Sequence, residues 1–207
     1  MKRKESKNSR HKKYTTYNPI SRYLVSSFFN KVGCLLSSIA FENVLDVGCG
    51  EGVLLAHIRE HLVGKRVFAM DIDPIEIETA KKNIPFANCI VGSIYKLPFV
   101  NHEFDLVMCT EVLEHLNAPS LALQEIRRVT PRYCILSVPN EPVWRFLNIA
   151  RGAYITNFGN TPAHVNHWSS MSFQQYVSDY FQIIKVIRPL PWTLLLCYQK
   201  NKLGNFT

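Results

Sequence analysis

The chain has 207 residues, with 24 Lys and Arg against 16 Asp and Glu, and a net charge of +8. Its hydrophobic fraction of 47% and charged fraction of 19% are ordinary for a globular protein, which excludes wholesale disorder, and its length indicates one domain. No apolar run approaches the ~20 residues that a membrane-spanning helix needs.

The positive charge is concentrated at the start of the chain. Residues 1–13 contain seven Lys and Arg and one Glu, so we expect residues 1–17 to form a basic, mobile tail and residues 18–207 to form one domain. The six cysteines include no CxxC pair, and most lie within apolar runs. Without a signal-peptide pattern, this usage predicts a cytoplasmic protein. The alternative is a mitochondrial address, because residues 1–17 are basic and contain Ser and Thr.

The predicted elements alternate along the chain. Apolar residues recur at helical spacing over 20–40 and predict an amphipathic helix. Strands are then predicted at 43–47, 66–70, 88–91, 104–109 and 132–138, and helices at 51–62, 74–82, 118–129 and near 170–180. This order predicts an α/β fold with a mostly parallel sheet covered on both faces. The short link between the runs 181–188 and 192–200 predicts an antiparallel pair.

Three glycines follow the first predicted strand at alternate positions, as Gly48, Gly50 and Gly52. Glycine lets the backbone turn tightly and approach a ligand. A dinucleotide fingerprint would need glycine at position 53, where valine stands, and Asp46 favours a cationic ligand over a pyrophosphate. Asp71, after the next strand, suits ribose hydroxyls. The alternative is a tight turn without a ligand.

A family resemblance rests on four segments in order: Leu45-Asp46-Val47-Gly48-Cys49-Gly50-Glu51-Gly52, Ala69-Met70-Asp71-Ile72-Asp73-Pro74, Leu97-Pro98-Phe99, and Phe104-Asp105-Leu106-Val107 followed by Glu111-Val112-Leu113-Glu114-His115-Leu116. Over about residues 43–140 the chain resembles class I S-adenosylmethionine-dependent methyltransferases, and most closely the subgroup with ubiquinone-biosynthesis O-methyltransferases. The resemblance implies a Rossmann-like, seven-stranded sheet of order 3-2-1-4-5-7-6, with strand 7 antiparallel.

The resemblance also implies a set of cofactor-binding residues: Asp46, Gly48, Gly50, Asp71, Ile72, Ser93, Ile94, Thr110 and Glu111. Asp46 and the glycine loop would hold the methionine part, Asp71 the ribose, and Ile72 the adenine. Ser93 stands where the family usually has an aspartate beside the adenine amine, and its hydroxyl can still accept a hydrogen bond.

Candidate catalytic and metal-binding residues lie nearby. Glu111, Glu114 and His115 have the spacing of one helical face, which predicts a candidate site for a divalent cation. The alternative is glutamates that cap helices and a histidine that packs. His164 and His167 lie in residues 140–170, which shape the acceptor pocket in this family. With His115, they are candidate bases for removing a proton from a hydroxyl. One of the two could also complete a metal shell with His115, and the alternative is a turn before the next helix.

Other side chains are weaker candidates. Trp144, Arg145, Tyr154 and Phe158 could wall the acceptor pocket or simply pack. His57 and His61 match an H-x-x-E-H zinc-protease pattern, but we expect a solvated helix edge there, because the neighbouring leucines define the buried face.

The sequence therefore predicts a methyltransferase that acts on a small molecule, with O-methylation favoured and an in-line transfer. The helix over 20–40 could close over the acceptor as a lid, or rest on a membrane surface if the acceptor is lipophilic. One alternative is an RNA 2′-O-methyltransferase that uses the basic tail and a metal, although no separate RNA-binding module is apparent. Another is a non-catalytic, cofactor-binding partner subunit.

Overall fold

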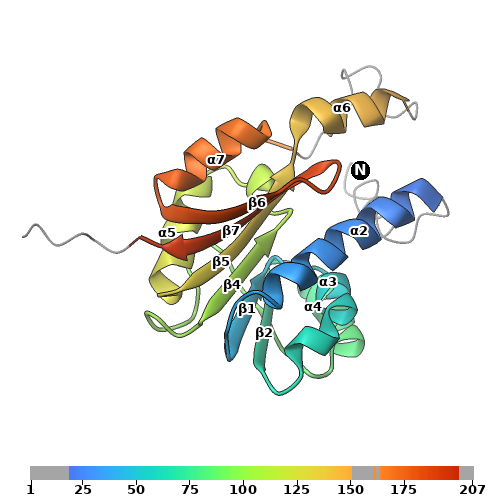
Figure 1. Ribbon diagram of the computed structural model, residues 1–207. Coiled ribbons are helices and arrows are strands. Elements are labelled where there is room, and N and C mark those ends of the chain that lie inside the picture. The colour runs from blue at the N-terminus through green and yellow to red at the C-terminus, as the bar shows by residue number, and fades with distance from the viewer. Residues whose placement is uncertain (1–18, 151–160, 162–163, 201–207) are drawn as a thin grey trace, which may run out of the picture.

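A seven-stranded sheet of order β3-β2-β1-β4-β5-β7-β6 organises the computed structural model, which describes residues 19–150, 161 and 164–200 (Figure 1). The strands are β1 Asn43–Val47, β2 Arg66–Asp71, β3 Asn88–Val91, β4 Leu106–Thr110, β5 Tyr133–Pro139, β6 Phe181–Ile187 and β7 Trp192–Gln199. The first five strands run parallel, and β7 pairs antiparallel with both β5 and β6. The strand order and the reversed hairpin confirm the predicted topology.

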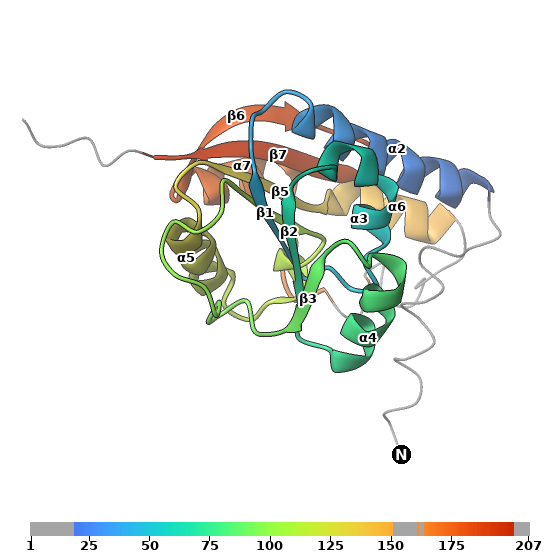
Figure 2. The same cartoon turned by 90° about the horizontal axis from the view of Figure 1, so that it is seen from below.

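Helices cover both faces of this sheet (Figure 2). They are α2 Pro19–Leu36, α3 Val53–His57, α4 Pro74–Asn83, α5 Pro119–Val129, α6 Glu141–Ala150 and α7 Ser170–Ser178, with short 3₁₀ helices η1 Arg59–Leu62 and η2 Leu113–His115. Successive strand residues point to opposite faces, so Val44 packs in the cluster with α2, α3 and α4, whereas Leu45 packs with α5 and α7. Within the described residues no helix is both long and apolar enough to cross a membrane.

Helix α2 is a core element over its second half. Phe28, Val32 and Leu35 are buried, and the Phe28 ring lies 5.0 Å from the Trp192 ring in β7. Ile20 and Tyr23 in its first turns are exposed. The helix is therefore present where the sequence predicts it, although it ends at Leu36, and its role as a lid stays a prediction.

The structure differs from the predicted elements at two places. The predicted helix over 51–62 is split, because α3 ends at His57 and a tighter 3₁₀ turn follows Ile58. Helix α6 was not predicted. The predicted basic tail, Tyr154 and Phe158 lie outside the described residues.

Candidate functional site

The glycine loop lies at the carboxyl edge of the sheet, between β1 and α3. Gly48, Gly50 and Gly52 all have positive φ, at 77°, 53° and 78°. A Cβ on Gly48 would stand 2.3 Å from Cγ2 of Val112, so the close packing of this loop on the chain after β4 requires glycine. The loop thus presents backbone at the edge where open α/β sheets bind ligands.

Asp46 is a buried carboxylate with an unused oxygen. It is 2% exposed, and its Oδ1 has no hydrogen-bond partner among the described residues. Burial, and then the negative charge of Asp71, raise the pKa of Asp46 from 3.8 to about 7. A buried polar atom without a partner is costly, so a cationic group placed against this loop would stabilise the ionised carboxylate.

Asp71 links the glycine loop to the start of α4. Its Oδ2 accepts a hydrogen bond from Gly50 N at 2.9 Å, and its Oδ1 accepts one from Asp73 N at 3.0 Å. Each carboxylate oxygen has a second lone pair, so this fixed carboxylate can also accept from a pair of hydroxyls. Ile72 beside it is 71% exposed and offers an apolar surface on which an aromatic base can pack.

The remaining predicted cofactor residues lie at the ends of β3 and β4. The Ser93 hydroxyl accepts a hydrogen bond from Tyr95 N at 3.3 Å and keeps its own proton and a lone pair for a ligand. Ile94 is buried, and Thr110 is the last residue of β4. Contact between these residues and a cofactor stays a prediction.

Glu111 does not join the predicted metal-binding face. It has a φ of 60°, and its Oε2 accepts a hydrogen bond from Trp192 Nε1 at 2.6 Å while its Oε1 accepts one from the Ser137 hydroxyl at 3.2 Å. Only Leu113–His115 are helical, as one 3₁₀ turn. The prediction that Glu111, Glu114 and His115 share one helical face is therefore wrong, because Glu111 lies outside this turn with a left-handed backbone conformation.

His164 takes the place of Glu111 in this cluster. One ligand atom each from Glu114, His115 and His164 lies within 4.8 Å of the others. Glu114 and His164 are buried, and the rings of His115 and His164 lie 5.1 Å apart. The structure thus brings Glu114 and His115, two of the three predicted metal-ligating residues, together with His164, one of the two histidines expected to complete such a shell.

A glutamate that the sequence analysis missed organises the histidines. Glu141, the first residue of α6, is 5% exposed. Its Oε1 lies 2.9 Å from His164 Nδ1 and 3.3 Å from His167 Nδ1, and its Oε2 accepts from Arg145 Nε at 3.1 Å. Burial opposes ionisation, but hydrogen bonds from the two histidines hold the pKa of Glu141 below its ordinary value. Its position just after the fifth strand was the available sequence signal.

The segment that carries both histidines is bound to neighbouring backbone. Val165 N and Asn166 N donate to the Glu114 carbonyl at 2.8 and 3.0 Å. The Asn166 side-chain amide donates to the carbonyls of Leu113 and Leu116 at 3.2 and 2.6 Å. These bonds attach the segment to η2, beside the end of β4.

The H-x-x-E-H histidines contact helix α2. His57 Nε2 lies 3.0 Å from Asn30 Oδ1, and His61 Nδ1 lies 3.2 Å from the Ser37 hydroxyl. The two histidines therefore help to attach α2 to α3 and η1. Both histidines are exposed, which agrees with the solvated helix edge that the sequence predicts.

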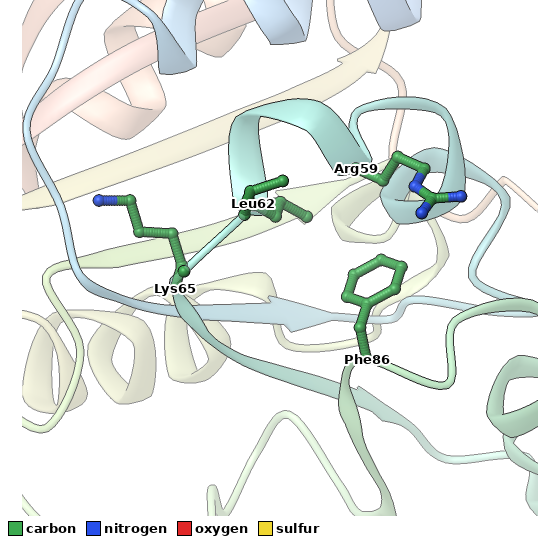
Figure 3. Close-up of a pocket in the computed structure, with 6 residues that line it drawn as sticks. Arg59, Leu62, Lys65 and Phe86 are labelled. Carbon is green, nitrogen blue, oxygen red and sulfur yellow. The ribbon is translucent and has the colours of Figure 1, made fainter.

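A cavity of about 270 Å³ lies at the opposite edge of the sheet (Figure 3). Its walls include Arg59 and Leu62 of η1, Lys65, and Phe86. Residues 62–65 lead into β2 and Phe86 leads into β3, so this cavity is at the amino edge and apart from the glycine loop.

The sheet order with its reversed last hairpin, together with the glycine loop and the two aspartates, defines the class I S-adenosylmethionine-dependent methyltransferase fold. The methyltransferase domain family matches residues 45–136. Residues 45–136 therefore match a methyltransferase domain, and this domain lies within the fold of that class.

Curated relatives share this domain over part of their length. An uncharacterized methyltransferase of Schizosaccharomyces pombe is 38% identical over 101 residues, which are 43% of this chain and 36% of the relative. The mitochondrial ubiquinone biosynthesis O-methyltransferase of the same yeast is 32% identical over 126 residues, covering 55% and 44%. A mitochondrial arginine-hydroxylase of Danio rerio is 35% identical over 92 residues, covering 43% and 27%. The chain thus spans less than half the length of these relatives.

Solved structures agree on the fold. A Pyrococcus horikoshii protein superposes with a TM-score of 0.73 at 16% identity, covering 95% of this chain and 99% of that one. Magnesium protoporphyrin IX methyltransferase from Synechocystis, solved with bound SAH, superposes with a TM-score of 0.67 at 17% identity, covering 88% of each chain.

Proposed function

We propose that the chain binds S-adenosylmethionine and transfers its methyl group to a small-molecule acceptor, with oxygen as the favoured acceptor atom. The observation that carries this proposal is the buried Asp46 oxygen, which has no hydrogen bond within the described part of the chain, next to a loop of glycines with positive φ. S-adenosylmethionine carries an ammonium and a sulfonium that suit Asp46, and a ribose diol that suits Asp71.

For this reaction the protein has to align the acceptor with the methyl group and remove a proton from the acceptor. The acceptor attacks the methyl carbon in line with sulfur, and the thioether leaves as a neutral group. A hydroxyl acceptor must also lose its proton, and general-base catalysis is worth roughly 10²–10⁴-fold. His115, His164 and His167, at the carboxyl ends of β4 and β5, are the candidate bases.

A divalent metal is a second cofactor that this site would suit. Glu114, His115 and His164 supply one carboxylate and two imidazoles, which are ligands for Mn²⁺ or Zn²⁺. When bound, such an ion would polarise an acceptor hydroxyl and lower its pKa.

Binding and transfer need separate experiments. Isothermal calorimetry with S-adenosylmethionine and S-adenosylhomocysteine tests the cofactor, and heat of binding for neither would reject the proposal. A methyl-transfer screen with labelled cofactor over phenolic, lipid, peptide and RNA fractions then identifies the acceptor. Repeating a confirmed transfer in EDTA tests the metal, which an unchanged rate would reject.

A binding protein that does not transfer methyl groups is the second candidate. The similar protein of Danio rerio favours this candidate, because its name, arginine-hydroxylase, gives a reaction other than methyl transfer. Cofactor binding without label in any fraction of the screen would favour it. Label in the RNA fraction would instead favour the RNA methyltransferase.

A further inference from the structure

Glu141 is a buried carboxylate that contacts two histidines through a single oxygen. Its Oε1 lies within 3.3 Å of Nδ1 of both His164 and His167. Its Oε2 accepts a hydrogen bond from Arg145 Nε at 3.1 Å, a contact that favours the ionised carboxylate, and an ionised carboxylate only accepts hydrogen bonds. Both Nδ1 atoms must therefore carry the proton, which leaves both Nε2 atoms with a lone pair when the imidazoles are neutral.

The two imidazoles differ in access. The His167 side chain is 33% exposed, whereas that of His164 is 1% exposed. The buried His164 Nε2 has no hydrogen-bond partner among the described residues, and it belongs to the cluster with Glu114 and His115. Of these two imidazoles, His167 is therefore the one whose Nε2 can take up a proton from an acceptor and pass it to water.

The position of Glu141 brings this pair toward the proposed cofactor loop. β4 alone separates β5, which leads into Glu141, from β1, which leads into the glycine loop. Adjacent strands lie about 4.8 Å apart, so these two strand ends are about 10 Å apart. A small acceptor placed between them would reach both.

We propose that Glu141 is a positioning residue that holds His167 with Nδ1 protonated and so presents its Nε2 lone pair to a hydroxyl acceptor. This rests on the proposed function. In the step, the acceptor oxygen forms a bond to the methyl carbon and the carbon–sulfur bond breaks. The acceptor proton moves to His167 Nε2, and the imidazolium, stabilised by the Glu141 carboxylate, then releases it to water.

Four other charged or titratable side chains surround Glu141 and His167. Arg145 on the same helix contacts the second oxygen of Glu141, and His164 shares the first. Glu114 and His115 of η2 lie beside His164. A pH profile must therefore be read together with a direct observation of the imidazoles.

The test compares Glu141→Gln with Asp105→Asn. Glutamine keeps the volume but loses the charge and offers an NH₂ group on one side. Asp105 is a matched control, because its carboxylate, like that of Glu141, has an arginine and two other N–H groups as partners. In Asp105 these are two backbone N–H groups and Arg132, at the amino edge of the sheet. Imidazole nitrogen NMR, assigned with His164→Gln and His167→Gln, reports the tautomers without any activity.

The wild type should show protonated Nδ1 and unprotonated Nε2 for both histidines at neutral pH. Glu141→Gln should disturb that pattern, lower kcat at least tenfold, move the acidic limb of the pH–kcat profile to lower pH, and leave the cofactor Kd within twofold. Glu141→Asp, which keeps the charge, should restore part of kcat. Asp105→Asn should change none of these readouts.

Protonated Nε2 atoms in the wild type would overturn the proposal, and so would imidazole signals or a kcat profile that Glu141→Gln leaves unchanged. An absence of cofactor binding would reject the proposed function, yet the NMR spectra would still decide whether Glu141 positions the imidazoles.

Discussion

Asp46 and Asp71 are two acidic residues at the ends of neighbouring strands, and their electrostatics differ. Asp46 is buried, and its pKa is raised to about 7 by burial and by Asp71. Asp71 is half-buried and accepts hydrogen bonds from two backbone N–H groups. One carboxylate is thus poised to gain charge when a cation binds, while the other is already oriented.

Replacing Asp71 with alanine should weaken cofactor binding by roughly 10–100-fold, because a hydrogen bond to a charged group contributes about 1.5–3 kcal/mol. Calorimetry with S-adenosylhomocysteine measures this loss. Asp73→Ala is the matched control. It removes the cap of α4, where Asp73 Oδ1 accepts from Ile75 N, and should cost about 1 kcal/mol of stability without weakening binding. Equal affinities for wild type and Asp71→Ala would refute the ribose assignment.

The raised pKa of Asp46 predicts a pH dependence of stability. Between pH 3.8 and about 7 the folded protein holds a proton on Asp46 that the unfolded chain has lost. The free energy of unfolding of the cofactor-free protein should therefore fall across this range, by up to about 4 kcal/mol, and then level off. Urea denaturation of wild type and Asp46→Asn at several pH values isolates this contribution. Parallel pH profiles for the two would contradict it.

The same group links cofactor binding to pH. A cationic ligand favours ionised Asp46, so cofactor affinity should rise as pH increases toward about 7. Binding at pH 6 should release a proton, which calorimetry in buffers of different ionisation enthalpy detects. Asp46→Asn should release none from this site, and equal release by the two proteins would exclude Asp46 as the source.

At the scale of elements, the residues of the candidate site lie mostly in loops and short turns outside the regular helices. The sequence pattern located the glycine loop and both aspartates, because these follow strands that apolar runs identify. It misplaced Glu111, since helical spacing was assumed where the backbone adopts a φ of 60°. Such a conformation costs a non-glycine residue energy, and the hydrogen bonds from Trp192 and Ser137 help to hold it.

The segment that carries the histidines should depend on Asn166. Asn166→Ala removes two side-chain hydrogen bonds to η2 carbonyls, at about 1 kcal/mol each. We expect a loss of about 2 kcal/mol in urea denaturation. Gln174→Ala, which removes two bonds that stay within α7, should cost less. A smaller loss for Asn166→Ala than for Gln174→Ala would show that this attachment contributes little.

At the scale of the whole molecule, the positive charge is unevenly distributed along the chain. Residues 1–13, which lie outside the described residues, carry a net +6 of the total +8. The excess of Lys and Arg over Asp and Glu therefore gives no support to a nucleic-acid site within residues 18–207.

Deleting residues 1–13 should leave the cofactor Kd and the free energy of unfolding unchanged. It should weaken any binding to a polyanion and reduce the salt dependence of that binding, because fewer counterions are released. Calorimetry, urea denaturation and a filter-binding assay at two salt concentrations measure the three quantities. Loss of cofactor binding on deletion would show that the tail belongs to the site.

The sequence by itself determined the α/β class, most of the elements and the position of the glycine loop, because alternating burial and the position of glycines are local properties of the chain. Only the tertiary structure decided which distant side chains meet. Glu141 and His164 are 23 residues apart, and the bonds that hold the histidine segment reach back to η2 across about 50 residues. No periodicity encodes such contacts, because they depend on where the ends of β4 and β5 place their loops in the folded sheet.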